Sequence, residues 1–595
     1  MDRITKAGEI WKQYLDGVKY QQAMGFTTDF PKFIAFKEGN QWAAVTENTK
    51  NLPRPVFNIT EMFIRAKRAA ITNQSLSMVY TPLEVFDDDE QQARSERGAE
   101  DFTDFAKIIW ENIDQEELNN EFVDDAVTVG TGILHYYWNP NKKGGNQLKW
   151  SGDMEGEVLD PLNVFFSNPQ RRKVQDQEWI IIQDRMTVGE AKELARRENV
   201  PEEFVKLIGA DDNESGEYAS ETKEVKENDK ITVLIKYFKK NGAVYYSKSI
   251  SNMVIVEDRL LTPVVEDGVD PEYKMTLYPI VLMSCIRRKK CIYGLGYAQD
   301  VIAVNKAINQ LKAMQLLNAI QCGNPALVTT PNAIRQKITN QGGQIITDYS
   351  PNGNGIRYLQ PPNFSSVFSQ LGNEMFELAR TTTGVTDVST GETLGANMAA
   401  SAIIALQNQA KTPIKELQNR YFSAIKEVGD IWLEFFKAYY NMDRNMAVEN
   451  EDGEVENRIF NGSRYAEIDY KLKVEVAVAS DKETLAVSLL DAMREREDIN
   501  KEQYVELMPD GAMPFKTQIK DIWAKEKQDV LVQAMEQIKQ YQMIIQQMQA
   551  QQGDVQKSNE MLGQAMGQIK QQDEIINQMG GMSNEVQGVP DGNVY

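Results

Sequence analysis

The sequence YAQDVIAVNKAINQLKAMQLLNAIQC, residues 297–322, is the stretch that decides the fold. Its apolar residues Val301, Val304, Ile308 and Leu311 recur at steps of three and four, which is the spacing of an amphipathic helix. Amides dominate the opposite surface: Asn305, Asn309, Gln310, Gln315, Asn318 and Gln321. The run therefore predicts a helix that packs on one side and presents a nearly neutral wall of amides on the other.

A turn-rich excursion and a returning helix follow this run. Residues 323–362 contain repeated Pro and Gly, with short strand-like pieces at 326–329 and 344–347. Residues 364–380 again have helical spacing, and 381–397 are rich in Thr, Gly and Ser. A long helix is expected from about residue 398 to 440, kinked at Pro413 because proline removes a backbone donor and clashes with the preceding turn.

The N-terminal part of the chain is predicted to be helical first and strand-rich afterwards. Helices are expected from Asn58 onward and over 90–129, where Gly130 and Gly132 break the pattern. Thr187 and Glu190 are spaced as a capping box for a short helix over 188–197. Strands are expected at 133–138, 179–183, 231–238, 244–247, 253–256, 279–286 and 471–479. The fold class is therefore α+β, mainly helical.

The C-terminal part has a different composition. Residues 531–580 hold fifteen Gln and six Met but a single aromatic residue, Tyr541, and their apolar positions recur at steps of three and four. Such a heptad seam needs partner helices to bury it, because one isolated helix of this kind is marginal in water. We expect an oligomeric helical tube or coil here, followed by a flexible tail at 581–595.

The charge balance limits the partners. The chain has 595 residues, with 65 Lys and Arg against 87 Asp and Glu, and a net charge of −22. A surface this acidic argues against a protein that grips nucleic-acid phosphates over most of its area, but it permits a channel through which DNA slides. The charged N-terminus predicts no signal peptide, and no run reads as a transmembrane helix.

The sequence lacks the residues that several kinds of metal, disulfide and nucleotide-binding site require. The single histidine, His135, cannot build a two-histidine metal site, and the three cysteines match neither a zinc pattern nor a disulfide framework, which favours a reducing, intracellular setting. No Gly-Lys dipeptide exists, so there is no phosphate-binding Walker loop, and the turn at 294–296 lacks the last glycine of a dinucleotide fingerprint. The acidic run at 87–90 is interpreted as a helix opening rather than a metal site. We therefore expect no enzyme, no cofactor and no metal.

One region carries the opposite charge. Between residues 285 and 344 there is one acid, Asp300, among eight bases: Arg287, Arg288, Lys289, Lys290, Lys306, Lys312, Arg335 and Lys337. The cluster at 287–290 is equally well read as a solvated strand end. Lys306 and Lys312 stand isolated among amides, where they would be sparse positive points on the wall of a pore. Such a wall binds phosphates weakly, which suits passage better than capture.

The order of elements resembles that of the portal (head-to-tail connector) proteins of tailed bacteriophages. Gly39-Asn40-Gln41-Trp42, followed by the segment 52–58, is similar to the N-terminal segment of that family. The stretch 384–396, leading into Ala399-Ala400-Ser401-Ala402-Ile403, is similar to its tunnel loop and long helix. The Gln-rich end resembles the helical barrel of portals from some short-tailed phages.

The resemblance implies a domain plan within a ring of twelve subunits at one capsid vertex. It assigns 1–294 to the first part of the wing, 295–322 to the first stem helix, 323–362 to the clip and 363–384 to the second stem helix. The tunnel loop is 385–397, and 398–480 form the long kinked helix and the second part of the wing. The crown is 481–525, the helical barrel 526–580 and the flexible tail 581–595.

The resemblance also implies sites and partners. The ring would be the channel for genome packaging and ejection, with double-stranded DNA passing without sequence specificity. Channel-facing candidates are Lys306, Lys312, Thr386, Asp387, Ser389, Thr390, Glu392, Thr393 and Asn397. Clip candidates for docking are Asn332, Arg335 and Lys337. Partners would be the terminase, which supplies the energy, then head-completion or tail proteins, and the major capsid and scaffold proteins. The location would be the virion, after assembly in the host cytoplasm, with no membrane involved.

Two other classes of protein stay open. One is a nuclease that uses carboxylates and a metal ion, although no spaced set of Asp and Glu stands out. The other is an intracellular scaffold or adaptor whose C-terminal coil recruits partners. The adaptor reading predicts that residues 1–525 are monomeric, whereas a portal predicts that the ring closes without the barrel.

Overall fold

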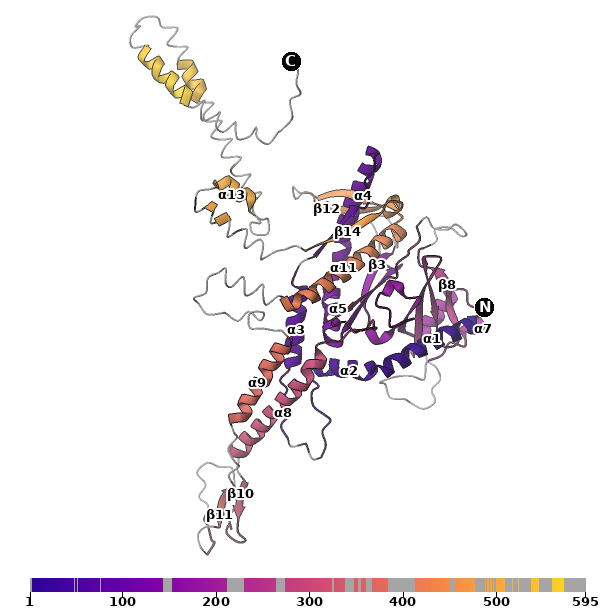
Figure 1. Ribbon diagram of the computed structural model, residues 1–595, viewed down its shortest axis with the longest axis vertical. Helices are drawn as coiled ribbons and strands as arrows, with labels where there is room; N and C mark the ends of the chain where they lie inside the picture. The colour runs from indigo at the N-terminus through magenta and orange to yellow at the C-terminus, as the bar shows by residue number, and fades with distance from the viewer. Residues whose placement is uncertain are drawn as a thin grey trace. The chain divides into compact units, whose positions relative to one another are not determined.

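The computed structural model divides the chain into two compact units, Met1–Ala477 and Val478–Tyr595. It describes residues 3–142 except 48, 51 and 75, then 152–210, 229–263, 273–323, 326–337, 347–351, 355–359, 366–383, 412–449 and 455–476. Beyond residue 477 it describes mainly 499–508, 537–544 and 559–571. The fold is α+β (Figure 1).

The helices of the first unit follow the expected order. They are α1 (Arg3–Ala23), α2 (Phe26–Lys37), α3 (Ile59–Thr72), α4 (Asp89–Asn112), α5 (Gln115–Val129), α6 (Val188–Arg197), α7 (Glu202–Val205), α8 (Ala298–Gly323), α9 (Ser366–Thr383) and α11 (Thr412–Tyr439). Asn58 caps α3, and both hydrogen bonds of the Thr187–Glu190 capping box are present at α6, which confirms those two predictions. The predicted helix over 90–129 is wrong in one respect, since left-handed Asp114 (φ 53°) separates α4 from α5.

Antiparallel pairing joins the described strands. A five-stranded sheet has the order β4 (Val164–Phe166), β5 (Trp179–Thr187), β6 (Lys230–Lys240), β7 (Ala243–Ser249) and β8 (Val254–Leu260). A three-stranded sheet contains β3 (Asp153–Val158), β2 (Thr131–Asn139) and β9 (Ile280–Ser284). Three two-stranded pairs are β1 (Leu76–Pro82) with β14 (Tyr470–Val476), β10 (Ala326–Thr329) with β11 (Ile356–Leu359), and β12 (Arg444–Glu449) with β13 (Val455–Phe460). The predictions had missed six of these strands: β1, β3, β4, β11, β12 and β13.

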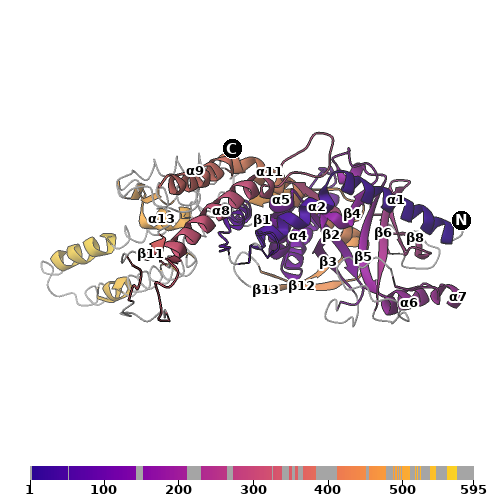
Figure 2. The same cartoon turned by 90° about the horizontal axis from the view of Figure 1, so that it is seen from below.

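Helices cover both faces of the five-stranded sheet because neighbouring residues of a strand point to opposite sides. Leu234 of β6 packs in an apolar cluster with Ala7 and Ile10 of α1, while Val233 packs in another with Ala191 of α6. Figure 2 shows α1 along one side of this sheet and α6 on the other. The sheet is thus enclosed, and its strands are correspondingly rich in apolar residues.

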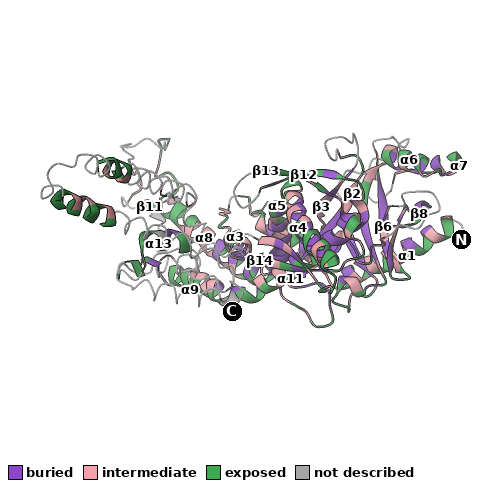
Figure 3. Cartoon of the chain, turned by 90° about the horizontal axis from the view of Figure 1, so that it is seen from above, coloured by how far each residue is buried: buried purple, intermediate pink, exposed green. Residues whose placement is uncertain are grey.

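The main core lies between the three-stranded sheet and helices α4, α5 and α11. Its centre is aromatic: Phe105 of α4 stacks on Phe460 of β13 at 3.9 Å between ring centroids, and Trp432 of α11 is fully buried. Figure 3 shows that buried residues concentrate in this region. His135 has a structural role, because its Nδ1 lies 2.8 Å from Glu157 Oε1 and its Nε2 lies 2.9 Å from the Tyr237 hydroxyl, which links the two larger sheets.

Glycines fix the place where α8 begins. Gly130, at φ +100°, ends α5, and its carbonyl accepts a 2.9 Å hydrogen bond from the Cys285 amide. The amide of Gly294 donates to Thr131 Oγ1 at 2.9 Å, and that of Tyr297 donates to the Val127 carbonyl at 2.8 Å. A Cβ on Gly130 would approach the backbone carbon of Leu295 to 2.6 Å. Cβ atoms on Gly294 and Gly296 would likewise clash with the backbone carbonyl oxygens of Gly130 and Thr128. The turn at 294–296 therefore needs glycine for close backbone packing, in agreement with its structural interpretation.

The second unit is described in shorter pieces. Helix α13 (Lys501–Leu507) has an Asn500–Gln503 capping box, and Tyr504, Val505 and Met508 form a small apolar cluster with Leu490. Residues 537–544 and 559–571 are helical, and none of them is buried in the single chain. The predicted helical character of this region is confirmed for those residues; its partner helices stay a prediction.

Candidate functional site

The helical run that decided the fold forms a hairpin with the returning helix. Helix α8 and helix α9 lie side by side (Figure 1), and Gln315 Nε2 donates to Ser369 Oγ at 3.0 Å. Near the start of the hairpin, Phe376 of α9 stacks on Phe63 of α3 with ring centroids 6.1 Å apart. The apolar cluster around this contact contains Val301, Val304, Ile308, Met375 and Ala379. The apolar face predicted from spacing is thus the face that packs on α3 and α9.

The amide face is not a uniform polar wall, which corrects the sequence interpretation. Asn305 and Asn309 are buried, with 0% and 2% of their surface exposed. Asn305 Oδ1 accepts from the amide and the hydroxyl of Thr60 at 2.9 and 3.0 Å, and its Nδ2 donates to Gln41 Oε1 and to the Phe57 carbonyl at 3.0 and 2.9 Å. These amides bind the N-terminal loop, residues 38–58, because a buried amide must satisfy all its donors and acceptors.

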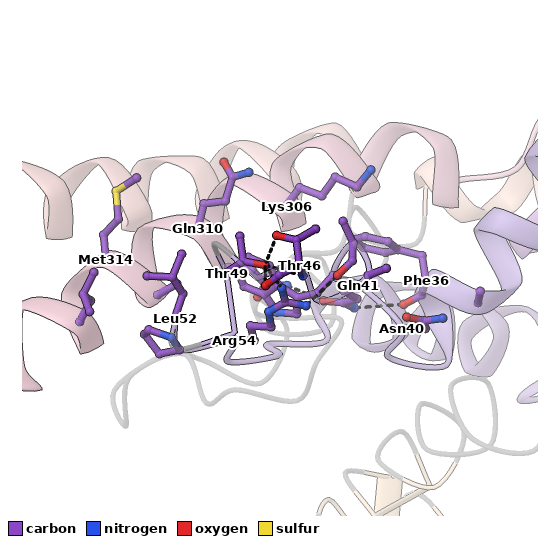
Figure 4. A pocket seen from close by; sticks show the side chains of 18 of the residues that line it. Phe36, Asn40, Gln41, Thr46, Thr49, Leu52, Arg54, Lys306, Gln310 and Met314 are labelled. Carbon is purple, nitrogen blue, oxygen red and sulfur yellow. Dashed lines mark hydrogen bonds between the residues drawn. The ribbon is translucent and has the colours of Figure 1, made fainter.

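A pocket of about 730 Å³ lies between α2, the N-terminal loop and α8 (Figure 4). Apolar side chains make up much of its lining, including Phe36, Leu52 and Leu317. Arg54 stiffens the loop side, donating to the Ala43 carbonyl at 2.7 Å and to Thr49 Oγ1 at 2.8 Å. The pocket is therefore a preformed, largely apolar hollow with cationic groups at its margin.

Lys306 belongs to this pocket. Its Nζ lies 5.6 Å from the centroid of the Phe36 ring, within the range of a cation–π contact. Lys312, six residues further along α8, is half-buried and lies about 120° away around the helix at 3.6 residues per turn. The two lysines therefore do not share one face, and their role in a channel stays a prediction.

The three predicted docking residues lie in the tip segment, which is the described part of the chain between α8 and α9: residues 326–337, 347–351 and 355–359. Asn332, Arg335 and Lys337 are all exposed, and the Arg335 guanidinium lies 4.7 Å from the centroid of the Tyr349 ring. The Tyr349 amide donates to the Ala333 carbonyl at 3.0 Å, which ties the two stretches together. Hydrogen bonds from the Ser350 amide and hydroxyl hold the pKa of Asp348 below its usual value. The segment is built to keep a charged surface outward.

The remaining predicted channel residues, Thr386, Asp387, Ser389, Thr390, Glu392, Thr393 and Asn397, lie outside the described residues. The same holds for the strand-like piece at 344–346, for the acidic stretch 211–228 and for the first part of the long helix, up to residue 411. Helix α11 is described from Thr412, so the kink expected at Pro413 is likewise not tested.

The basic cluster at 287–290 agrees in part with the prediction of a solvated strand end. Lys290 adopts a left-handed conformation (φ 52°) in the connection between β9 and α8, and Arg287, Lys289 and Lys290 are exposed. Arg288 lies over Phe26, 5.7 Å from its centroid. This cluster is a solvated turn that also holds α2.

The sequence reasoning missed the exposed apolar residues of α9. Val367, Leu371 and Leu378 are 62%, 38% and 59% exposed, and they recur at steps of four and seven. That spacing was visible in the sequence as a second apolar stripe beside Met375, Phe376 and Ala379.

Metal and membrane sites find no support in the part of the chain that the structure describes. There, no group of three or more His, Cys, Asp and Glu side chains is placed to hold a metal ion. Among the described helices, none combines the length and the apolar character that a membrane crossing demands. Cys285 and Cys291 are buried and Cys322 is exposed, all as free thiols.

The model of the family described as "Phage P22-like portal protein" matches residues 262–579, more than half of the chain. The matched range begins before β9 and includes the α8–α9 hairpin, the tip segment, α11 and the Gln-rich end. No curated protein matches the sequence.

Proposed function

Because this chain belongs to the phage P22-like portal protein family, we propose that the α8–α9 hairpin is the stem through which its copies close into a ring around DNA. The family assignment makes the protein a phage portal, a structural component of the capsid that serves genome packaging and tail docking. It also implies a ring oligomer that interacts with the capsid, the terminase and DNA. The assignments to particular residues are the proposal.

One observation carries the proposal: the hairpin keeps large apolar residues at its surface. Val367 and Leu378 of α9, and Met314 and Ile320 of α8, are each more than half exposed in the single chain. A stable soluble monomer rarely leaves such a set uncovered on one projecting element, since each buried side chain of this size contributes about 2 kcal/mol. Neighbouring hairpins in a ring would cover them.

The remaining parts take the places that the portal plan gives them. We assign 1–294 and 398–480 to the wing, 323–362 to the clip, 385–397 to the tunnel loop, 481–525 to the crown and 526–580 to the barrel. The exposed Arg335 and Lys337, with Asn332, are proposed to meet the terminase during packaging and head-completion or tail proteins afterwards. The ring is proposed to have twelve copies, to assemble in the host cytoplasm with capsid and scaffold proteins, and to act without enzymatic activity or cofactor.

We propose contact with DNA in the channel for all the tunnel-loop residues but for only one of the two stem lysines. Lys312 keeps the proposed position toward the lumen of the stem, and the tunnel-loop residues Thr386 to Asn397 keep theirs. Lys306 lies beside the pocket, so its position favours a contact between protein surfaces over direct contact with DNA.

Light scattering with negative-stain imaging of the purified full chain tests the proposal. Twelve copies of a 67.6 kDa chain have a mass of about 811 kDa, and the images should show a ring with a central hole. A chain that stays monomeric at high concentration and with capsid and scaffold proteins added would refute it.

A truncated chain, residues 1–525, separates the portal from the adaptor. If wing and stem contacts close the ring, the truncated chain still assembles. If the Gln-rich coil alone drives assembly, the truncated chain is a monomer, and an adaptor is the better description of the protein. A nuclease would instead cleave DNA with magnesium and lose that activity with a chelator.

A further inference from the structure

The two sides of the α8–α9 hairpin differ in a way that suits two neighbouring copies of this chain. We propose that the outer stripe of α9, defined as Val367, Leu371, Glu374 and Leu378, docks into the pocket between α8 and the N-terminal loop of the adjacent copy. This inference rests on the proposed ring and goes beyond it by naming the two surfaces that meet.

The outer stripe and the pocket lie on opposite sides of the hairpin. On α9, each residue of the outer stripe stands two positions from one that faces α8, as Leu378 does from Phe376 and Leu371 from Ser369. On α8, the pocket residues Lys306 and Gln310 each stand two positions from Ile308. Two residues span about 200° of an α-helix, which is roughly half a turn.

Opposite, different surfaces are what a closed ring requires of a head-to-tail contact. In such a contact, each copy uses one side to bind its left neighbour and the other side to bind its right neighbour. A knob on one side and a hollow on the other therefore repeat around the ring. The pocket is open and preformed, with about 730 Å³ of space, and the stripe offers three aliphatic side chains to fill it.

The two surfaces also match in height. Gln315 and Ser369 are hydrogen-bonded, so they mark one level of the antiparallel hairpin. Counting from that pair, Leu371 lies level with Ala313, Glu374 with Gln310 and Leu378 with Lys306. A rotation about the ring axis leaves height unchanged, so a stem that runs along the axis brings these levels together.

Charge agrees with the apolar match. The outer stripe carries one acid, Glu374, and it is exposed. The pocket carries three bases and no acid: Lys32, Arg54 and Lys306. Lys306 lies one helical turn from the level of Glu374, about 6 Å along the axis at 1.5 Å per residue, which a lysine side chain can reach. An interface of this kind gains selectivity for its own register from the ion pair.

Disulfide cross-linking in the full chain tests the contact directly. In a Cys322→Ser background, the variant with both Ala313→Cys and Leu371→Cys is oxidised mildly after assembly. The two cysteines lie on opposite sides of one hairpin and so cannot join within a chain, and we expect a ladder of covalent multimers. The matched controls, with either cysteine alone, should give no ladder.

Charge reversal gives a second readout that does not depend on cysteines. We expect Lys306→Glu and Glu374→Lys each to raise the protein concentration for half-assembly about tenfold, and the double variant to return to the wild-type value. Lys289→Glu makes the same charge change in the exposed turn between β9 and α8, away from both surfaces, and should not move that concentration. Circular dichroism of each variant confirms that the chain is folded.

The outcomes separate this inference from the proposed function. If the wild-type chain forms rings but the paired cysteines give no ladder, or Lys306→Glu behaves like Lys289→Glu, the docking contact is refuted while the portal ring stands. If the wild-type chain never forms rings under any of the conditions above, both are refuted together.

Discussion

Replacing Asn305 by leucine removes the anchor that holds the N-terminal loop to the stem helix. The side chain makes four hydrogen bonds in a fully buried setting, two of them to the backbone groups Thr60 N–H and Phe57 C=O. Leucine has a similar volume but no polar atoms, so the Thr60 amide and hydroxyl lose their acceptor, while the Phe57 carbonyl keeps its 2.9 Å hydrogen bond from the Ile59 amide. An orphaned buried group costs ~1–3 kcal/mol, and Thr60 is fully buried, whereas the Phe57 carbonyl keeps a partner. The expected loss is about 3 kcal/mol for local opening.

Hydrogen exchange in the full chain measures this loss. Three kcal/mol corresponds to roughly a 100-fold faster exchange at the start of α3, where the Thr60 amide sits, since every 1.4 kcal/mol is tenfold. Helix α6, which packs on another sheet, should be unchanged. The matched control is Gln321→Leu, an exposed amide on the same helix, which should leave exchange at α3 as in the wild type. Wild-type exchange at α3 in a folded Asn305→Leu chain would refute the anchoring role.

Two further outcomes follow from buried groups in the same unit. Burial, and next the charge of Asp124, raises the pKa of Asp125 to about 7. Between pH 4 and 7 the native chain therefore holds a proton that the unfolded chain has released. Because the native state binds more protons, the free energy of unfolding falls as pH rises through this range. Asp125→Asn should therefore raise Tm over the wild type at pH 8 and leave it unchanged at pH 4; equal Tm values at pH 8 would contradict this. Gly130→Ala should lower the free energy of unfolding by more than about 3 kcal/mol and lower the yield of soluble chain. The control Gly242→Ala, at φ +83° with nothing within 4 Å of the new Cβ, should lower it by only about 1 kcal/mol. Similar thermal unfolding of the two variants would show that the close packing at Gly130 is unimportant.

The periodicity of the sequence predicted the helices and most strands because these elements bury one regular face. Helix α8 and strand β6 were placed within one residue or two of their observed bounds. The hairpin β12–β13 was missed because its exposed strand positions, such as Asn445 and Asn457, are poor strand formers in isolation. Its stability comes instead from Phe460, which packs on Phe105 far away in sequence. Local pattern carries no information about that contact.

The candidate site was predicted less well, for a related reason. An amide on a helix can face water, a pore or another backbone segment, and its spacing does not distinguish these. Asn305 and Asn309 face the N-terminal loop, some 250 residues earlier in the chain. The sequence therefore predicted correctly that this face is neutral and forms hydrogen bonds. It could not predict which segment of the chain supplies the partners of those hydrogen bonds.

The buried amides give a physical reason for placing the N-terminal loop against the stem. Apolar side chains alone would hold a loop of this composition loosely, because they bind without direction. The Asn305 and Asn309 amides fix its register, since Gln41 Oε1 accepts from both, at 3.0 Å from Asn305 and 2.6 Å from Asn309. A loop fixed in this way keeps Arg54 and Leu52 at the rim of the pocket without help from a neighbour. The docking surface would then exist before the ring closes, so the cost of ordering it is met during folding of each chain and not during assembly. Loosening the anchor with Asn305→Leu should therefore weaken assembly as well as local stability, and both effects should appear in the same variant.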